Sequence, residues 1–582
     1  MVKVSDYVME FLKEKGIKEI FMLPGGGAMH LLDSLGKSGI EYICFQHEQG
    51  AAIAAEAYGQ HTNEPGCLLV TSGPGATNAI TGVTAGWIDS TPMFVISGQS
   101  KRADLVGDKQ VRQIGSQEVQ IIDMVKPITK YAVQIMEPAE IRYHLERAYY
   151  ECTNGRPGPV WLSIPLDVQG AIIDEVNLKG FLPKEARKSC ISNDVLKVVD
   201  LLKDAKAPLF IAGNGIKLSG ATEMFYQLLE QINVPVLTTW KTIDMFAEDH
   251  PVYVGHPGIM GDRGANKILQ KADLLISVGS RLDTSITAFN DALFGKNAKK
   301  VIVDIDVHEI NRMQMKKEVE IVSDAGEFLA CLTEIIGEES LPDWSGWLTS
   351  CKELRAGYPL VTDKHRDTGD YVSAYYFIDE LCKELRADDV IVPESSGGAG
   401  EITYQAFQIK KGQKMKNAAG LGSMGFGLPY SIGSCIANDK RRTVLINGDG
   451  AFTLNIQELE TMHRLKLPIK MFILSNGGYA SIRSMQRGNF EGRYVASSED
   501  SGFTIPDISA VAKAYGFQTC SMKSNEEMLQ MLPKIMADDE PLLCEVFVSP
   551  DETVWPRVKA VVLPDGGMRS GELENMWPYA EE

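Results

Sequence analysis

Short apolar runs alternate with amphipathic, helix-like segments along most of the chain. Each apolar run ends in glycines and small polar residues, as in EIFMLPGG (19–26), CLLVTSGPG (67–75) and MFVISGQ (93–99). Short strands followed by Gly-rich turns and helices are typical of parallel sheets that helices cover on both faces. The pattern therefore predicts an α/β protein built from doubly wound parallel sheets.

The alternation falls into three blocks, and a chain of 582 residues is too long for one hydrophobic core. We therefore predict three domains, at residues 1–178, 190–345 and 371–550. A segment near 338–370 is interpreted as a linker between the second and third domains. Residues 551–582 are rich in proline and glycine, and we expect an irregular tail that packs on the rest of the chain.

The most informative segment is an apolar strand, VLI, that ends in the turn NGDG and carries Asp449. After a helical segment, a second apolar strand (IKMFIL) ends at Ser475, and Asn476 follows 27 positions after Asp449. In a parallel sheet both turns lie at the carboxyl edge, where such folds bind ligands. Carboxylate and amide oxygens suit Mg²⁺, and glycines let backbone N–H groups approach a phosphate. Gly-Asp-Gly alone is also an ordinary turn, but the strands and the closing Asn favour a site for Mg²⁺ and a diphosphate.

Composition excludes several classes of partner. The formal net charge of −19 argues against nucleic acid and anionic membrane as partners. Hydrophobic residues make up 44 %, yet no apolar run is long enough to span a bilayer. The first sixteen residues predict an amphipathic helix with acids and lysines, unlike a signal peptide. The ten cysteines are scattered without CxxC pairs, which is typical of a reduced cytoplasmic protein.

Glu48 lies where a strand-like YICFQ meets the small-residue helix AAIAAEAYG. A lone Glu at this place is usually an acid that favours the helix N-terminus. Here it accompanies four other motifs in order: LPGGGAMHLLD, LVTSGPGATNAITG, GLGSMGFGLPYSIG and the GDG turn with its Asn. This set resembles thiamine diphosphate (ThDP)-dependent enzymes, specifically the acetohydroxyacid (acetolactate) synthase branch. The resemblance covers all three blocks and implies a pyrimidine-binding, a central FAD-type and a diphosphate-binding domain.

The resemblance implies a role for each matching position. Glu48 matches the glutamate that hydrogen-bonds N1′ of the aminopyrimidine, and Gly422 the glycine whose carbonyl receives the 4′-amino group. Met424 matches the apolar residue that supports the bent cofactor, although a plain core methionine would look the same. The implied Mg²⁺ ligands are Asp449, Asn476 and the carbonyl of Gly478, and further cofactor contacts are Gly25, Gly26, Pro74, Asn78, Gly397, Gly448, Gly450 and Ala451.

The middle block resembles the family's FAD-binding domain. The matching positions are Gly213, Gly215, Gly279, Arg281, Asp304 and Asp324. Each one alone is a common turn after a strand, so a vestigial nucleotide fold without ligand is the competing interpretation. Bound FAD with a structural role is favoured by fold-level analogy. In the family Glu48 and the GDG turn at one cofactor come from different subunits, which implies a homodimer or a homotetramer.

Three positions depart from the family pattern, and all belong to the pocket for the second substrate. Ser116 stands where the family has Phe, Ser285 where it has an Arg for the acceptor carboxylate, and Met485 where it has Trp. A serine cannot replace an Arg that pairs bidentately with a carboxylate. Gln117 is retained and is interpreted as a contact of the intermediate. The half of the site that uses the donor is thus intact, whereas the acceptor half differs.

A further departure is the run Ser396-Gly397-Gly398-Ala399-Gly400, where the family has Gly-Gln-His-Gln; backbone N–H groups of such a loop could still cradle phosphate. Residues 476–494 and 565–578 resemble a subgroup linked to bacterial surface-sugar biosynthesis, in which the acceptor is a ketone of a nucleotide-linked deoxysugar. We therefore predict decarboxylation of pyruvate or a close 2-oxo acid and transfer of two carbons to a carbonyl other than a second 2-oxo acid.

Three alternatives stay open. The first is an acetolactate synthase catalytic subunit with a repacked acceptor site. The second is ThDP-dependent C–C hydrolysis of a cyclic diketone. The third is a non-catalytic ThDP-binding or regulatory homologue, and Glu48 argues against it because such a chain needs no carboxylate at that position.

Overall fold

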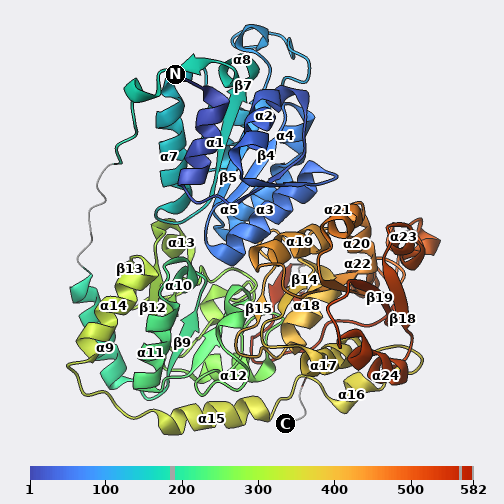
Figure 1. Ribbon diagram of the computed structural model, residues 1–582. Coiled ribbons are helices and arrows are strands. Elements are labelled where there is room, and N and C mark those ends of the chain that lie inside the picture. The colour runs from blue at the N-terminus through green and yellow to red at the C-terminus, as the bar shows by residue number, and fades with distance from the viewer. Residues whose placement is uncertain (184–190, 563–566, 580–582) are drawn as a thin grey trace.

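Three parallel sheets, each between layers of helices, make up the protein (Figure 1). The computed structural model describes residues 1–183, 191–562 and 567–579. The strand orders are β3-β2-β4-β5-β7-β6, β10-β9-β11-β12-β13 and β15-β14-β16-β17-β19-β18, and neighbouring strands run parallel throughout. The predicted architecture of three doubly wound parallel-sheet domains is confirmed. The predicted boundary at residue 190 lies outside the described residues.

The N-terminal domain holds the first sheet, and the amphipathic helix predicted at the N-terminus packs on it with Val8 and Leu12 buried. Its strands are β2 (Glu19–Met22), β3 (Glu41–Cys44), β4 (Gly66–Val70), β5 (Met93–Gln99), β6 (Tyr131–Gln134) and β7 (Pro159–Pro165), and a short antiparallel pair joins β1 (Val2–Lys3) to β8 (Ile172–Ile173). Its helices are α1 (Val4–Glu14), α2 (Met29–Ser38), α3 (Glu48–Thr62), α4 (Pro74–Asn78), α5 (Ile80–Asp89), α6 (Ile121–Val125), α7 (Ile141–Thr153) and α8 (Leu166–Gln169).

The central domain carries the second sheet. Its strands are β9 (Pro208–Ala212), β10 (Val236–Thr238), β11 (Leu274–Val278), β12 (Lys299–Asp304) and β13 (Val319–Val322). Its helices are α9 (Ser192–Asp204), α10 (Gly215–Leu218), α11 (Thr222–Ile232), α12 (Arg263–Lys271), α13 (Val307–Arg312) and α14 (Ala325–Ile336). The segment interpreted as a linker contains helix α15 (Ser345–Ala356), which packs against α12. The indoles of Trp344 and Trp347 donate to backbone carbonyls of this domain, so the linker is anchored to it.

The third sheet lies in the C-terminal domain. Its strands are β14 (Val390–Pro393), β15 (Lys414–Met415), β16 (Thr443–Gly448), β17 (Ile469–Ser475), β18 (Gln518–Met522) and β19 (Leu542–Phe547). Its helices are α16 (Asp363–Arg366), α17 (Ala374–Glu384), α18 (Gly397–Ala406), α19 (Gly427–Ala437), α20 (Asp449–Phe452), α21 (Glu458–Leu465), α22 (Ala480–Asn489), α23 (Ile508–Ala514) and α24 (Asn525–Ile535). The helical segment expected after the GDG turn corresponds to α21, and a further short helix, α20, begins at Asp449 itself.

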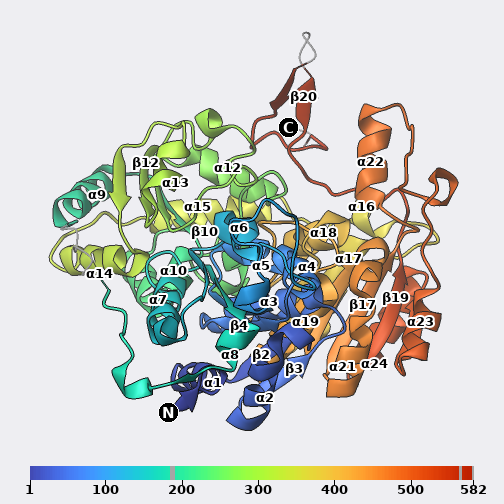
Figure 2. The same ribbon diagram turned by 90° about the horizontal axis from the view of Figure 1, so that it is seen from above.

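The C-terminal tail returns to the central domain. It forms a two-stranded hairpin, β20 (Ala560–Val562) and β21 (Met568–Ser570), where we expected irregular chain, and the hairpin projects from the body of the molecule (Figure 2). Leu573 and Met576 are buried in the core of the central domain, and Arg263 of α12 donates to the carbonyl of Met576. Within the described residues, no helix is long and apolar enough to cross a membrane.

Helices α3 and α19 pack against each other and join the N-terminal and C-terminal domains (Figure 1). Most of the buried residues of α3 are alanines and glycines, and Ala54 faces Gly433 of α19. A Cβ atom at Gly433 would lie 2.3 Å from the carbonyl oxygen of Ala54, so only glycine permits this approach. The small-residue pattern of α3 thus serves helix-to-helix contact between domains.

The carboxyl group of Glu56 is buried in this helix pair. Glu56 of α3 accepts hydrogen bonds from Gln60 and Thr91, at 2.7 and 2.8 Å, and the phenol of Tyr430 on α19 faces it. Burial raises the pKa of Glu56 to about 7, while the nearby Lys241 acts in the opposite direction and Asp89 adds to the rise. The folded protein therefore keeps this proton at pH values where the unfolded chain has lost it.

We expect Glu56→Gln to remove a pH dependence of stability. A raised pKa of Glu56 stabilises the folded state fully below about pH 4, and this stabilisation is lost as the pH rises through 7. On going from pH 5 to pH 9, the free energy of unfolding of Glu56→Gln should therefore rise by up to about 3 kcal/mol relative to that of wild type. Urea unfolding across this range measures the difference, and Glu64→Gln, at an exposed carboxyl just after α3, should show none. If the free energies of unfolding of Glu56→Gln and wild type changed in parallel with pH, the raised pKa of Glu56 would be wrong.

Candidate active site

The carboxyl edge of the first sheet gathers the predicted pyrimidine-side residues. The turns after β2 and β4 lie against each other, since the amide of Gly27 donates to Thr71 Oγ1 at 3.0 Å. A Cβ atom at Gly25 would lie 2.5 Å from Thr71 Cβ, so this turn requires glycine. Gly26 begins the short 3₁₀ helix that follows. The first Gly-rich motif therefore shapes this edge of the site.

Glu48 is the first residue of α3, and its side chain is only 8 % exposed. The Nδ2 of Asn78 donates to its Oε2 at 2.9 Å. Pro74 begins α4, the short helix that carries Asn78. Gln117 lies beside the same turn, since a Cβ atom at Gly73 would be 2.2 Å from its carbonyl oxygen. The structure thus brings Glu48, Pro74, Asn78 and Gln117 to one edge of the sheet.

The two turns of the GDG–Asn motif meet at the carboxylate of Asp449, which is 2 % exposed. Its Oδ2 accepts the backbone N–H groups of Asn476, Gly477 and Gly478 at 2.9, 2.8 and 3.2 Å. Its Oδ1 accepts the N–H of Gly450 at 2.7 Å. Burial raises the pKa of Asp449, and these hydrogen bonds to the ionised form act in the opposite direction. The residues expected to bind Mg²⁺ therefore lie side by side.

Glycines shape the turn around this carboxylate. Gly477 and Gly478 have φ values of +74° and +131°, which side-chain-bearing residues rarely adopt. A Cβ atom at Gly450 would lie 2.6 Å from the ring of Tyr479, which also stacks on Phe503. No group of three or more His, Cys, Asp or Glu side chains that could hold a metal occurs among the described residues. A ligand set of one carboxylate, one amide and one carbonyl still suits Mg²⁺, which retains several waters.

Hydrogen bonds between the N-terminal and C-terminal domains of the chain lie close to both sets of residues. The Nδ2 of Asn455, which follows α20, donates to Gly425 O at 2.7 Å and to Gln49 Oε1 at 3.3 Å. Glu458 of α21 accepts the N–H of Gln46 at 3.2 Å. The start of α3 therefore lies beside the turn of Gly422 and Met424. Gly422 has a φ of +61°, and Met424 is 40 % exposed, so it is not a core methionine.

The run 396–400 is not the loop that we predicted. Helix α18 begins at Gly397, so Gly397 and Gly398 form its first turn. The N–H of Gly398 donates to Ser481 Oγ of α22 at 3.1 Å. Free N–H groups at a helix N-terminus favour a phosphate as those of a loop do, so the physical argument for diphosphate binding is unchanged.

A cavity in the central domain contains most of the residues predicted to bind FAD. Gly215, Gly279, Arg281, Asp304 and Asp324 line it, together with residues of both other domains. Gly213 lies behind its wall, where a Cβ atom would be 2.1 Å from Ser280 Cα. Asp304 ends β12, and burial raises its pKa. Asp324 also caps α14 by accepting two backbone N–H groups. Glycine turns beside a carboxylate at a strand end fit a dinucleotide.

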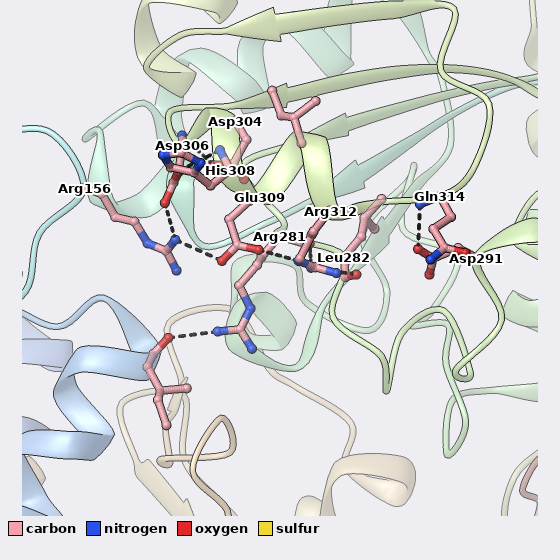
Figure 3. A network of polar contacts seen from close by, with 12 residues as sticks. Arg156, Arg281, Leu282, Asp291, Asp304, Asp306, His308, Glu309, Arg312 and Gln314 are labelled. Atoms are coloured by element: carbon pink, nitrogen blue, oxygen red, sulfur yellow. Dashed lines mark hydrogen bonds and ion pairs between the residues drawn. The ribbon is translucent and has the colours of Figure 1, made fainter. Parts of the chain in front are cut away.

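Arginines connect this cavity to the N-terminal domain (Figure 3). Arg156 pairs with Asp306 at 2.9 Å and with Glu309 at 3.0 Å. Arg281 donates to the carbonyl of Ile88 at 2.9 Å, and Arg312 bonds Glu309 at 2.6 Å. The cavity therefore lies at a charged junction between domains.

The three residues predicted to shape the acceptor pocket are not joined by hydrogen bonds among the described residues. Ser285 lines the central cavity, together with Arg281. Ser116 is exposed beside Gln117, and Met485 is 48 % exposed on α22. The sequence analysis also missed Asn455, which belongs to the helical segment after the GDG turn. Its position after that motif was the only available signal, because its partners come from other parts of the chain.

Family models match each domain in turn. Residues 2–124 match the N-terminal TPP-binding domain of thiamine pyrophosphate enzymes, residues 195–332 their central domain and residues 396–546 their C-terminal TPP-binding domain. The order agrees with the positions of Glu48 and Asp449 on the first and third sheets. Thiamine diphosphate-binding domains are therefore present at both halves of the site.

Curated relatives match nearly the whole chain. The acetolactate synthase large subunit of Lactococcus lactis subsp. lactis is 31% identical over 98% of this chain and 95% of its own length. The corresponding subunit of Corynebacterium glutamicum is 32% identical over 95% and 88%. The isozyme 2 large subunit of Escherichia coli is 30% identical over 98% and 99%. Together with the geometry at Glu48 and Asp449, these matches show that the chain belongs to the acetolactate synthase-like family of thiamine diphosphate-dependent enzymes.

Proposed function

We propose that this enzyme decarboxylates pyruvate or a close 2-oxo acid and transfers the two-carbon unit to an acceptor carbonyl other than a second 2-oxo acid. The observation that carries the donor half is the pairing of Glu48 with an intact Asp449–Asn476 turn. The acceptor half is argued from Ser116, Ser285 and Met485, which differ from the family pattern. A ketone of a nucleotide-linked sugar is the acceptor class that the resemblance of 476–494 suggests.

The residues at the third sheet fit Mg²⁺ and a diphosphate. Asp449, Asn476 and the carbonyl of Gly478 would hold the metal, and the first turn of α18 would face the phosphates with backbone N–H groups. Bound thiamine diphosphate supplies a thiazolium ring that accepts the electron pair released by decarboxylation. Glu48 is held by Asn78 with its carboxylate at the helix start, where it would exchange a proton with N1′ of the aminopyrimidine. Gln117 would contact the substrate from the same edge.

The residue type at position 285 supports the choice of acceptor. Ser285 lines the central cavity and offers a hydroxyl group instead of a cation for an acceptor carboxylate. The second candidate, acetolactate synthesis with a repacked site, is favoured by one observation. Arg281 lines the same cavity, and its Nη1 donates a hydrogen bond to the carbonyl of Ile88. A carboxylate could pair with the remaining N–H groups.

Purified protein with ThDP, Mg²⁺ and pyruvate should release carbon dioxide when a ketone acceptor is added. The product should be the acceptor enlarged by the two-carbon unit of pyruvate. Glu48→Gln should lower the rate by at least about 100-fold, the usual size of a proton-transfer contribution. Mass analysis of products identifies the adduct. Glu64→Gln, whose carboxyl lies on the surface beyond the same helix, is the matched control and should retain full activity.

Other outcomes separate the alternatives. Efficient acetolactate formation from pyruvate alone would overturn the proposed acceptor and identify an acetolactate synthase. Hydrolysis of a cyclic diketone without turnover of a 2-oxo acid would identify a C–C hydrolase. A Glu48→Gln variant as fast as wild type would show that the proposed role of Glu48 is wrong.

FAD is the ligand that we propose for the part of the central cavity around Asp304 and Asp324, with a structural role. Asp304 should accept hydrogen bonds from its ribose, so Asp304→Asn should weaken FAD binding by about 10- to 100-fold, as for a lost hydrogen bond to a charged group. Flavin fluorescence titration measures this affinity. Asp291→Asn, in the same domain but outside the cavity lining, should bind FAD like wild type. Failure of wild type to bind FAD would refute this cofactor and leave the carboligase proposal intact.

We also propose a homodimer or a homotetramer with active sites shared between subunits, as the family resemblance implies. Co-expression of Glu48→Gln with Asp449→Ala tests it. If each site takes Glu48 from one subunit and Asp449 from the other, mixed dimers contain one intact site, and random assembly restores about a quarter of wild-type activity. If each site lies within one chain, as the contacts of Asn455 also permit, every site carries a defect and activity stays at the level of the single variants.

A further inference from the structure

Arg483 is a buried cation beside the turn expected to bind the metal. It belongs to α22, and its side chain is only 7 % exposed. No carboxylate lies within ion-pair distance of it among the residues that the structure describes, although the charge of Asp449 acts on it through space. Burial lowers its pKa, as expected for a cation without a close anionic partner. A buried charge of this kind must be compensated by hydrogen bonds.

The guanidinium donates to backbone carbonyls from three parts of the chain. Its Nη2 lies 2.8 Å from the carbonyl oxygen of Asn476 and 3.4 Å from the side-chain Oδ1 of the same residue. Its Nη1 lies 3.3 Å from Gly477 O and 2.9 Å from Ser497 O. The carbonyl of Pro550 is the third attachment point, at 3.4 Å. The planar fork of an arginine can reach these acceptors together, whereas the point charge of a lysine cannot.

The same contacts fix the positions of the oxygens of the turn. Arg483 donates to the carbonyls of Asn476 and Gly477 and, at 3.4 Å, to Asn476 Oδ1, whereas Gly478 O accepts the N–H of Ala480 at 3.2 Å. An oxygen with one hydrogen bond keeps a second lone pair, so Asn476 Oδ1 and Gly478 O can still face a cation. At Gly478, a Cβ atom would lie 2.7 Å from Ser497 O and 3.1 Å from Arg483 Nη1. Glycine at 478 and arginine at 483 are therefore parts of one packing arrangement. Asp449 holds the turn by its N–H groups, and Arg483 holds it by its carbonyls.

We propose that Arg483 is a positioning residue for the metal site, which fixes Asn476 and the Gly477-Gly478 turn so that Asn476 Oδ1 and Gly478 O face the cation. The inference rests on the proposed function, because it assumes that this turn binds Mg²⁺ with ThDP. Groups that orient metal ligands typically contribute 10- to 100-fold in metal affinity. The charge of Arg483 acts in the other direction, because it repels a divalent cation. The two effects predict opposite results on substitution.

The experiment is a titration of metal-free full-length protein with Mn²⁺ at saturating ThDP, in which electron paramagnetic resonance counts free Mn²⁺. Arg483→Met removes fork and charge, and Arg483→Lys keeps the charge alone. We expect both variants to bind Mn²⁺ about 10- to 100-fold more weakly than wild type. Arg487→Met is the matched control, since Arg487 lies one turn further along α22 at the surface and pairs with Asp551. Its dissociation constant should stay within about 2-fold of wild type.

Circular dichroism and thermal midpoints establish that each variant is folded at the temperature of the titration. If Arg483→Met does not fold, Arg483→Lys decides. Wild-type affinity or tighter binding in a folded Arg483 variant would overturn the inference, because charge repulsion or a purely structural role would then explain the residue. If wild type shows no ThDP-dependent Mn²⁺ binding, the proposed function fails first, and this inference fails with it.

Discussion

The active site depends on the hydrogen bonds that the buried carboxylate of Asp449 accepts. Asp449 lies at the end of one strand and takes backbone N–H groups from the turn after the next strand. An ionised carboxyl group with so little exposure is stable only with such partners. The need for three consecutive N–H groups explains the unusual backbone of Gly477 and Gly478, and it explains why a single ion-pair partner could not replace this turn.

A second constraint is the closeness of α3 and α19. Because Ala54 meets Gly433 without room for a side chain, the two domains approach until Gln49 and Asn455 share a hydrogen bond. The polar contact between Gln49 and Asn455 thus follows from a small residue less than two helical turns further along α3. A change in the packing of α3 on α19 would therefore also move Gln49 relative to Asn455.

Much of this arrangement could be predicted from the sequence. Hydrophobic runs with Gly-rich ends identify the parallel sheets, and sheet topology alone places Asp449 next to Asn476. The partners of Asn455 and Arg483 could not be predicted, because they come from segments distant in the chain that meet only after packing. The helical start at Gly397 was missed because glycines normally indicate a loop. Ser285 lines the cavity of the central domain and Met485 lies on α22, and that they shape one acceptor pocket stays a prediction.

The tail has a consequence for the order of events during synthesis. Leu573 and Met576 complete a core whose other members include Leu209 and Ile211. The ribosome makes the chain from its N-terminus, and domains generally fold as they emerge. Part of the apolar surface of the central domain therefore stays uncovered until residues 573–576 have been synthesised. Chaperone demand during translation should fall on the middle of this protein, rather than on either of its ends.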